Sequence, residues 1–203
     1  MVTTHLRRRI ALVLAAALLT LGASAMVNHT AQAATIGPPQ IEIAATALKP
    51  AVRLSQSGVI MFPMDPLPKC ALSKTSFNQP RSGGRLHEGI DLMASLDQKV
   101  YAVDNGVLWK QAIDGPTALL SGNAWYVQLA DGTYFFYGHM SHFADGLKVG
   151  DAVTRGQVIG YVGDTGNAGP LNYHLHFEVH PKGGAAVDPY PLLTIPKSCT
   201  VVA

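Results

Sequence analysis

The chain has 203 residues, of which 14% are charged, and it contains 20 glycines and 13 prolines. The length suits one domain with a hydrophobic core and leaves little room for a second, and the composition is typical of a turn-rich β protein. The formal net charge of +2 includes three arginines within the first 33 residues; the remaining chain has 12 basic and 13 acidic side chains, which argues against nucleic-acid binding.

The first 33 residues are typical of a secretory signal peptide. Three arginines at 7–9 precede an apolar run over 10–21, and small residues follow. Cleavage is expected before Ala34, after "AQA", with "ASA" ending at Ala25 as the second choice. An uncleaved membrane anchor is the alternative, but the apolar run is shorter than the ~20 residues that a span needs. We therefore expect a secreted, extracytoplasmic protein without a membrane span in its mature form.

The mature chain is expected to hold one folded domain between two short flanking segments. Residues 34–57 contain prolines and no sustained period, which indicates a linker or an N-terminal arm. The domain is placed at 58–195 and a C-terminal tail at 196–203. The two cysteines, Cys70 and Cys199, lie near the ends of this region, and export favours a disulfide between them over two free buried thiols.

From Gly58 onward, short β-branched and aromatic runs are separated by turn residues. The runs are "GVIMFP", "KVYAVDNGVLWKQAI", "NAWYVQLADGTYFFYGHM", "DAVTRGQVIGYVGDTGN" and "YHLHFEVHP". Asp-Asn-Gly and Ala-Asp-Gly inside them are hairpin signals. No helical period of ten residues follows the leader. The mature protein is therefore predicted to be nearly all β.

Five side chains along these runs are candidates for a metal site. His87 and Asp91 are four residues apart, and positions i and i+4 of an extended segment share one face. His139 ends an aromatic strand. His174 and His176 share one face of an alternating strand whose other face is apolar. Any one of these histidines alone is more simply explained as a surface or hydrogen-bonded residue, but together they predict convergence on one ion.

The chemistry of zinc narrows the use of these five side chains. A catalytic zinc ion needs three nitrogen or oxygen ligands and an open position for water, whereas a structural zinc ion usually takes four ligands, often cysteines. Three ligands from five candidates leave two histidines that can position the water, move its proton or stabilise an oxyanion. The spacing therefore favours zinc-dependent hydrolysis of an acyl bond, and it leaves open which histidine does which task.

The order of these motifs resembles a known family. His87-x-x-x-Asp91, then His139 after a tyrosine, then His174-x-His176 followed by Phe-Glu are similar to the lysostaphin-type zinc metallopeptidases, which cut cross-links or stem peptides of bacterial peptidoglycan. The likeness extends over about residues 58–193. It implies a mostly β fold, with an antiparallel sheet or barrel-sandwich of the duplicated hybrid motif type and an active-site groove.

The resemblance also implies a task for each candidate. His87, Asp91 and His176 would bind one zinc ion per chain, and His139 and His174 would be the catalytic residues that do not bind it. The protein would then be a zinc metalloendopeptidase that hydrolyses peptidoglycan peptides with zinc-activated water. A monomer is expected, and a regulatory protein partner is left open.

Residues beside the motifs are less specific. Residues 171–173 lengthen the loop that enters the last motif relative to the common family form, which leaves substrate contacts there in doubt. Glu178 shares a face with His174 and His176, and a structural hydrogen-bonding role fits the family pattern better than metal ligation or a role as general base. His142 and His180 are expected to face solvent.

The sequence is consistent with two roles for each of three further side chains. Tyr137 either lines the groove or packs in the core. Arg81 and Arg85 either meet carboxylates of a peptide or belong to a solvated loop.

Two other functions are weighed against the peptidase. A non-catalytic relative that regulates other wall hydrolases would use the same groove, but such proteins usually lose zinc ligands and this chain keeps them. A carrier or sugar-transport relay domain would share the pattern of "GDAVTRGQVIGYVG", but the tight turn has no lysine and a signal peptide does not suit a cytosolic relay.

Overall fold

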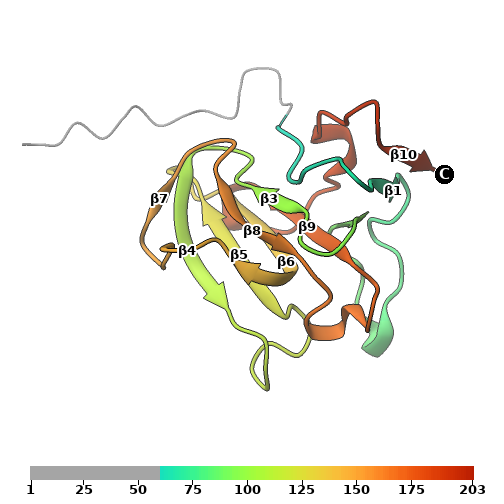
Figure 1. Ribbon diagram of the computed structural model, residues 1–203, viewed down its shortest axis with the longest axis horizontal. Coiled ribbons are helices and arrows are strands. Elements are labelled where there is room, and N and C mark those ends of the chain that lie inside the picture. Colours follow the sequence, from blue (N-terminus) through green and yellow to red (C-terminus); the bar gives the residue numbers. More distant parts are fainter. Residues whose placement is uncertain (1–59) are drawn as a thin grey trace, which may run out of the picture. The chain divides into compact units, whose positions relative to one another are not determined.

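Figure 1 shows the computed structural model, which describes residues 60–203. The expected signal peptide, residues 1–33, and the expected linker, residues 34–57, lie outside the described residues. Strands dominate, which confirms the mostly β class, and the helices are short 3-10 turns. Within residues 60–203, none of these helices is long and apolar enough to cross a membrane.

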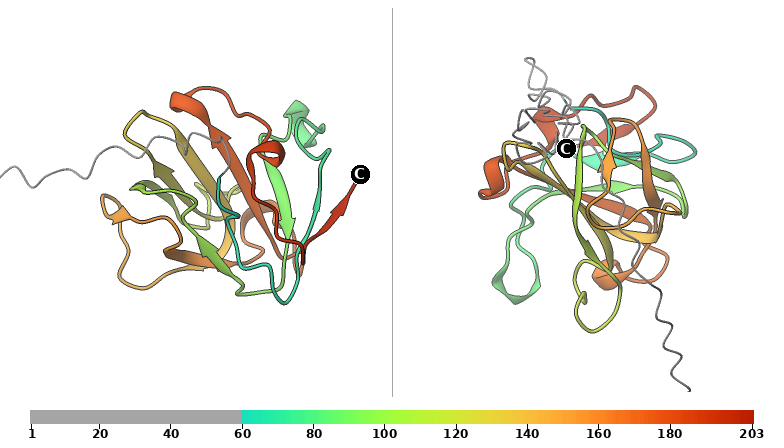
Figure 2. Two further views of the ribbon diagram at one scale, coloured as in Figure 1. Left: turned by 90° about the horizontal axis from the view of Figure 1, so that it is seen from above. Right: turned by 90° about the vertical axis from the view of Figure 1, so that its left-hand side faces the viewer.

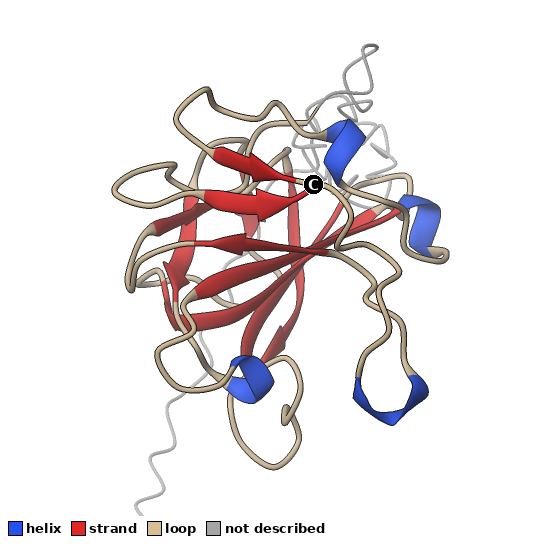
Figure 3. Ribbon diagram, turned by 90° about the vertical axis from the view of Figure 1, so that its right-hand side faces the viewer, coloured by secondary structure: helices blue, strands red, loops and turns tan. Residues whose placement is uncertain are grey.

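Most strands are short, and the connections between them range from tight turns to the long loops at 74–89 and 181–199. The strands are β1 (Ala71–Ser73), β2 (Ile90–Met93), β3 (Lys99–Tyr101), β4 (Gly106–Ala112), β5 (Asn123–Gln128), β6 (Tyr134–Phe143), β7 (Ala152–Val153), β8 (Val158–Val162), β9 (His174–His180) and β10 (Thr200–Val202). The 3-10 helices are η1 (Ser82–Gly84), η2 (Gly166–Ala168), η3 (Pro181–Gly183) and η4 (Tyr190–Leu192). Figure 3 shows these helices in blue, within the loops that connect the red strands.

The strands form one open sheet in the order β10-β1-β2-β9-β6-β5-β4-β7. Paired strands are antiparallel, as predicted, except β1 and β10, which run parallel and make the sheet mixed at that edge. The long strand β6 is a branch point, because its first half pairs with β9 and its last residues pair with β8, which in turn pairs with β3. The predicted β architecture is confirmed as a branched sheet that does not close.

The two faces of the central strands have opposite character. In β9, Leu175, Phe177 and Val179 are buried in the core, while the alternate residues face the other side of the sheet. Burying each such large apolar side chain contributes about 1.5–3 kcal/mol to folding. Tyr137 is also fully buried, and its hydroxyl oxygen accepts a hydrogen bond from the Val103 N–H at 3.0 Å. Tyr137 therefore packs in the core and does not line the groove.

The chain between β1 and β2 forms a hairpin that projects from the sheet (Figure 2), with η1 at its tip. Backbone hydrogen bonds of 2.9 Å join its two arms, from the Arg81 N–H to the Arg85 carbonyl and from the His87 N–H to the Gln79 carbonyl. Gly83 at the tip has a φ of 74°, which glycine adopts without steric cost. These hydrogen bonds and the turn at the tip fix the position of His87, which lies in the arm that leads into β2.

A disulfide joins the two ends of the described chain. Cys70 and Cys199 are bridged across a sequence separation of 129 residues, as predicted. The Thr200 N–H donates to the Cys70 carbonyl at 2.9 Å, and β10 continues from there alongside β1. Residues 196–203, expected as a tail, thus include Cys199 and a strand of the sheet.

Removing this bridge should lower stability. A Cys70→Ala/Cys199→Ala double variant is expected to lose about 2–5 kcal/mol of unfolding free energy, because the bridge restricts the unfolded chain over a long loop. Denaturant unfolding of the oxidised protein and of the variant measures the difference, with Ser198→Ala as the neighbouring control. Equal unfolding midpoints for the protein and the double variant, together with two free thiols in the protein purified under oxidising conditions, would contradict the prediction.

Candidate metal centre

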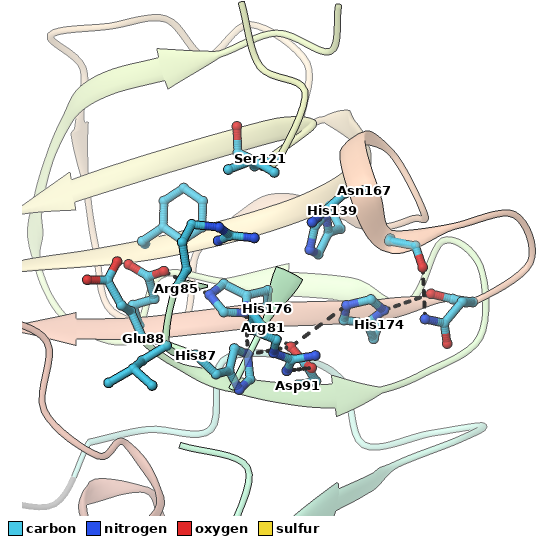
Figure 4. Close-up of a pocket in the computed structure, with 16 residues that line it drawn as sticks. Arg81, Arg85, His87, Glu88, Asp91, Ser121, His139, Asn167, His174 and His176 are labelled. Atoms are coloured by element: carbon cyan, nitrogen blue, oxygen red, sulfur yellow. Dashed lines mark hydrogen bonds and ion pairs between the residues drawn. The ribbon is translucent and has the colours of Figure 1, made fainter. Parts of the chain in front are cut away.

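The site begins with a cross-strand pair. Asp91 of β2 lies directly opposite His176 of β9, and the Asp91 Oδ1 is 3.0 Å from the His176 Nδ1. His87, which precedes β2, brings its Nε2 to 3.0 Å from the same Asp91 oxygen and to 2.9 Å from the His176 Nδ1. Three donor atoms from two strands and one hairpin therefore converge on one point (Figure 4).

This donor set fits a zinc ion. Two nitrogens and one carboxylate oxygen are the ligand types of a catalytic zinc, which leaves one position open. Donors at zinc bond lengths in a tetrahedron lie about 3.3 Å apart. The observed separations of 2.9–3.0 Å need only a slight opening to reach that geometry. His87, Asp91 and His176 together could hold one metal ion.

The outer nitrogens of both histidines are already occupied. The His87 Nδ1 lies 2.8 Å from the Ser76 carbonyl, and the His176 Nε2 lies 2.8 Å from the Glu178 Oε1. Each acceptor fixes a proton on the outer nitrogen and orients the ring. The inner nitrogens, Nε2 of His87 and Nδ1 of His176, are thereby directed at the metal position.

The hydrogen bonds that orient the His176 ring continue through Glu178 to His180. The Glu178 Oε2 is 2.7 Å from the His180 Nε2, and the His180 Nδ1 is 3.0 Å from the Gly184 carbonyl. Tyr134 stacks on the His180 ring with centroids 4.2 Å apart. His180 is only 6% exposed, so the expectation that it faces solvent is wrong, whereas His142 is exposed as expected. The period-two alternation of β9, continued past Glu178, is the signal that would have placed it.

His139 and His174 lie beside the three donors. Their ring centroids are 4.7 Å apart, and the His174 Nε2 is 3.8 Å from the Asp91 Oδ1. Each ring is held by a carbonyl at its Nδ1, Thr165 at 2.8 Å for His139 and Asn172 at 2.7 Å for His174. The structure therefore brings all five predicted residues together.

His139 occupies the branch point of β6. Gly138 is the last β6 residue paired with β9, and Met140 is the first paired with β8. Between them His139 has a φ of 63°, the left-handed conformation that few residues other than glycine adopt. Its N–H donates to the Ser121 carbonyl at 2.9 Å. At this residue β6 leaves β9 and turns toward β8, and the turn directs the His139 ring toward His174.

His139 and His174 are uncharged at pH 7, whereas His176 and Asp91 form a charged pair. Burial lowers the pKa of His139 to about 4 and also lowers the pKa of His174, so both rings are neutral at pH 7. Burial also disfavours the charged form of His176, but its hydrogen bonds with Asp91 and Glu178 outweigh burial and raise its pKa to about 9. Burial acts upward on the pKa of Asp91, yet its hydrogen bonds with His176 and His87 hold that pKa far below the usual range.

A cleft of about 290 Å³ opens over these residues. One wall is the hairpin before β2, whose Arg81 guanidinium contacts the Asp91 Oδ2 at 2.7 Å. The opposite side includes Ser121 and Asn167, and the lengthened loop contributes Asn172 (Figure 4). The three donor atoms therefore lie on the floor of a cleft whose hairpin wall carries Arg81.

Comparison with known proteins is consistent with this geometry. Residues 85–189 match the description of peptidase family M23. The chain is 33% identical to the L-Ala--D-Glu endopeptidase of Bacillus subtilis strain 168 over 125 residues, which are 55% of this chain and 35% of that protein. It is 34% identical to the glycyl-glycine endopeptidase ALE-1 of Staphylococcus capitis over 117 residues, 55% of this chain and 30% of that protein.

A crystal structure from Ruminococcus gnavus, named for a glycyl-glycine endopeptidase lytM, has a similar fold. Its TM-score is 0.56 at 28% sequence identity, and the match covers 66% of this chain and 59% of that chain. The chain spans between 21% and 35% of the length of the curated relatives that it matches.

The charge division can be measured on the metal-free protein. At pH 7 the His176 ring is expected to be doubly protonated and the His139 ring neutral, as read from side-chain nitrogen chemical shifts in an NMR titration. Because the pKa of His176 is raised from 6.5 to about 9, its proton stabilises the metal-free fold fully below pH 6.5, and this contribution is lost as the pH rises through about 9. Glu178→Gln should lower the pKa of His176. A neutral His176 at pH 7 would contradict the prediction.

Proposed function

The chain belongs to peptidase family M23, and from that membership we propose that it is a secreted zinc metalloendopeptidase that hydrolyses peptide bonds of bacterial cell-wall peptidoglycan. One observation carries the proposal. Three zinc-type donors, from His87, Asp91 and His176, meet on the floor of an open cleft beside two neutral histidines. In this proposal the three donors hold one zinc ion, and His139 and His174 are catalytic.

A bound zinc ion supplies a Lewis acid and lowers the pKa of a bound water molecule. The chain must supply the remaining parts. Asp91 can offer only Oδ1, because Arg81 occupies its other oxygen. Glu178 holds the His176 ring from behind, so that the ring cannot turn away from the ion.

His139 and His174 provide groups that can move a proton. Their Nδ1 atoms are engaged by backbone carbonyls, which leaves each neutral Nε2 free to accept a proton from water or, once protonated, to donate to a developing oxyanion. Their lowered pKa values keep them in the accepting form at pH 7. Two such groups 4.7 Å apart suit the two sides of one tetrahedral intermediate.

The open sheet face provides room for the substrate. The donors of β2 and β9 lie on the side of the sheet opposite the core, together with Phe136, Tyr134 and Tyr126, and the hairpin and the loop before β9 border this face. An extended peptide laid across this face would pass its carbonyl over the metal position. A non-catalytic regulator that uses the same cleft has less support, because the donor set and both neighbouring histidines are complete.

Digestion of purified peptidoglycan tests the function and the division of tasks. Wild-type protein loaded with zinc is expected to release peptide-cleaved fragments, and chelation should abolish this activity until zinc is returned. His176→Ala should lose both zinc and activity, since two ligands hold the ion poorly. His174→Ala should keep its zinc and lose at least ~10²-fold in rate, as when one transition-state donor is removed.

Zinc content and fragment yield are measured on the same samples, with peptidoglycans of several cross-link types. Loss of zinc in His174→Ala with full zinc in His176→Ala would reverse the two tasks. Intact peptidoglycan of every type after treatment with fully loaded protein would contradict the function.

The hydrogen bond between Glu178 and His176 gives a second test of the proposed zinc site. Glu178→Gln is expected to weaken zinc binding by about 10–100-fold, because an amide orients the ring less firmly and leaves it less basic. Competition with a chelator measures the dissociation constant. Glu88→Gln is the matched control, since Glu88 lines the same cleft and makes no side-chain hydrogen bond to a described residue. Equal zinc affinity in both variants would remove Glu178 from the centre.

A further inference from the structure

Two arginines flank the tip of the hairpin that walls the cleft, and only one of them is engaged. Arg81 contacts the Asp91 Oδ2 at 2.7 Å. Arg85 is exposed, lines the same cleft, and forms neither a side-chain hydrogen bond nor an ion pair with any residue in the range 60–203. Figure 4 shows both side chains reaching from the hairpin into the cleft. Arg85 therefore presents five free N–H donors toward whatever lies over the metal position.

The carboxylates of the cleft do not neutralise Arg85. Asp91 is shared between the histidines and Arg81, and Glu178 is held between His176 and His180. Glu88 also lines the cleft, forms neither an ion pair nor a side-chain hydrogen bond with residues 60–203, and acts electrostatically on Tyr134 and His180. Figure 4 places it at the end of the cleft away from His174. With a divalent ion bound, two arginines and the ion face three carboxylates, which leaves the cleft positive.

We propose that Arg85 is a carboxylate-binding subsite that selects stem peptides carrying a free carboxylate near the cleaved bond over uncharged oligoglycine bridges. This inference rests on the proposed function. The planar guanidinium can grip a carboxylate through two parallel N–H···O bonds, which an amide cannot match. Glu88 lies on the same side of the cleft as Arg85 (Figure 4), so its negative charge weakens the preference that Arg85 provides.

The relatives leave this choice open. One is named as an L-Ala--D-Glu endopeptidase, whose bond adjoins an acidic residue, and another as a glycyl-glycine endopeptidase, whose bond adjoins none. Their identities to this chain, 33% and 34%, are alike. The exposed guanidinium of Arg85 in the cleft favours the acidic substrate class for this chain.

The test uses two synthetic stem peptides that differ only in one side chain, a free carboxylate in the first and the corresponding carboxamide in the second. Zinc-loaded wild-type protein should cleave the acidic peptide with a kcat/KM about 10–100-fold higher, the range of one charge-assisted hydrogen-bonded pair. Arg85→Gln should bring the acidic peptide down to the level of the carboxamide, chiefly through KM, with zinc content unchanged. Arg155→Gln, which removes an exposed arginine outside the cleft, should keep the preference.

Glu88→Gln should increase the preference further, because it removes the repulsion. Equal kcat/KM values for the two peptides in wild-type protein, or a preference that survives Arg85→Gln, would overturn the inference and leave the proposed function standing. Calorimetric binding of the same peptides separates the two claims. Tighter binding of the acidic peptide without cleavage of either one would support the subsite and contradict the peptidase function.

Discussion

The register between β2 and β9 is the constraint on which the centre depends. It places Asp91 opposite His176, and it does so because Ile90, Leu92 and Phe177 are fully buried on the other face of the same strands. A slip of one residue would exchange the faces and drive Asp91 into the core. The free energy that fixes the register is therefore hydrophobic, while the atoms that it positions are polar. Folding of the core and assembly of the donors are one event.

The surroundings of each histidine determine whether its ring is charged. His176 lies between the carboxylates of Asp91 and Glu178. In the metal-free protein its ring is protonated on both nitrogens, including Nδ1, the nitrogen that faces Asp91 and His87. His139 and His174 are buried without such partners, bonded instead to neutral carbonyls, and stay uncharged. A metal ion thus competes with a proton at His176, and the two catalytic candidates remain proton acceptors throughout.

Much of this could be predicted from local pattern. Alternation along β9 gave the strand and its faces, and the order of His87, Asp91 and His139 indicated one converging group. The remaining features depend on long-range pairing, which no local period records. The parallel pairing of β10 with β1, and the contact of Arg81 with Asp91, are of this kind. His180 is a different case, because the period-two alternation of β9 includes it and is visible in the sequence.

The backbone at His139 restricts how this protein can change over evolutionary time. A positive φ is tolerated well by glycine, asparagine and aspartate and poorly by branched or bulky residues. Few substitutions at this position keep the branch of β6 intact, and none of those three replacements offers an imidazole. A descendant that lost the imidazole at this position but kept the fold would be expected to carry one of those three residues here.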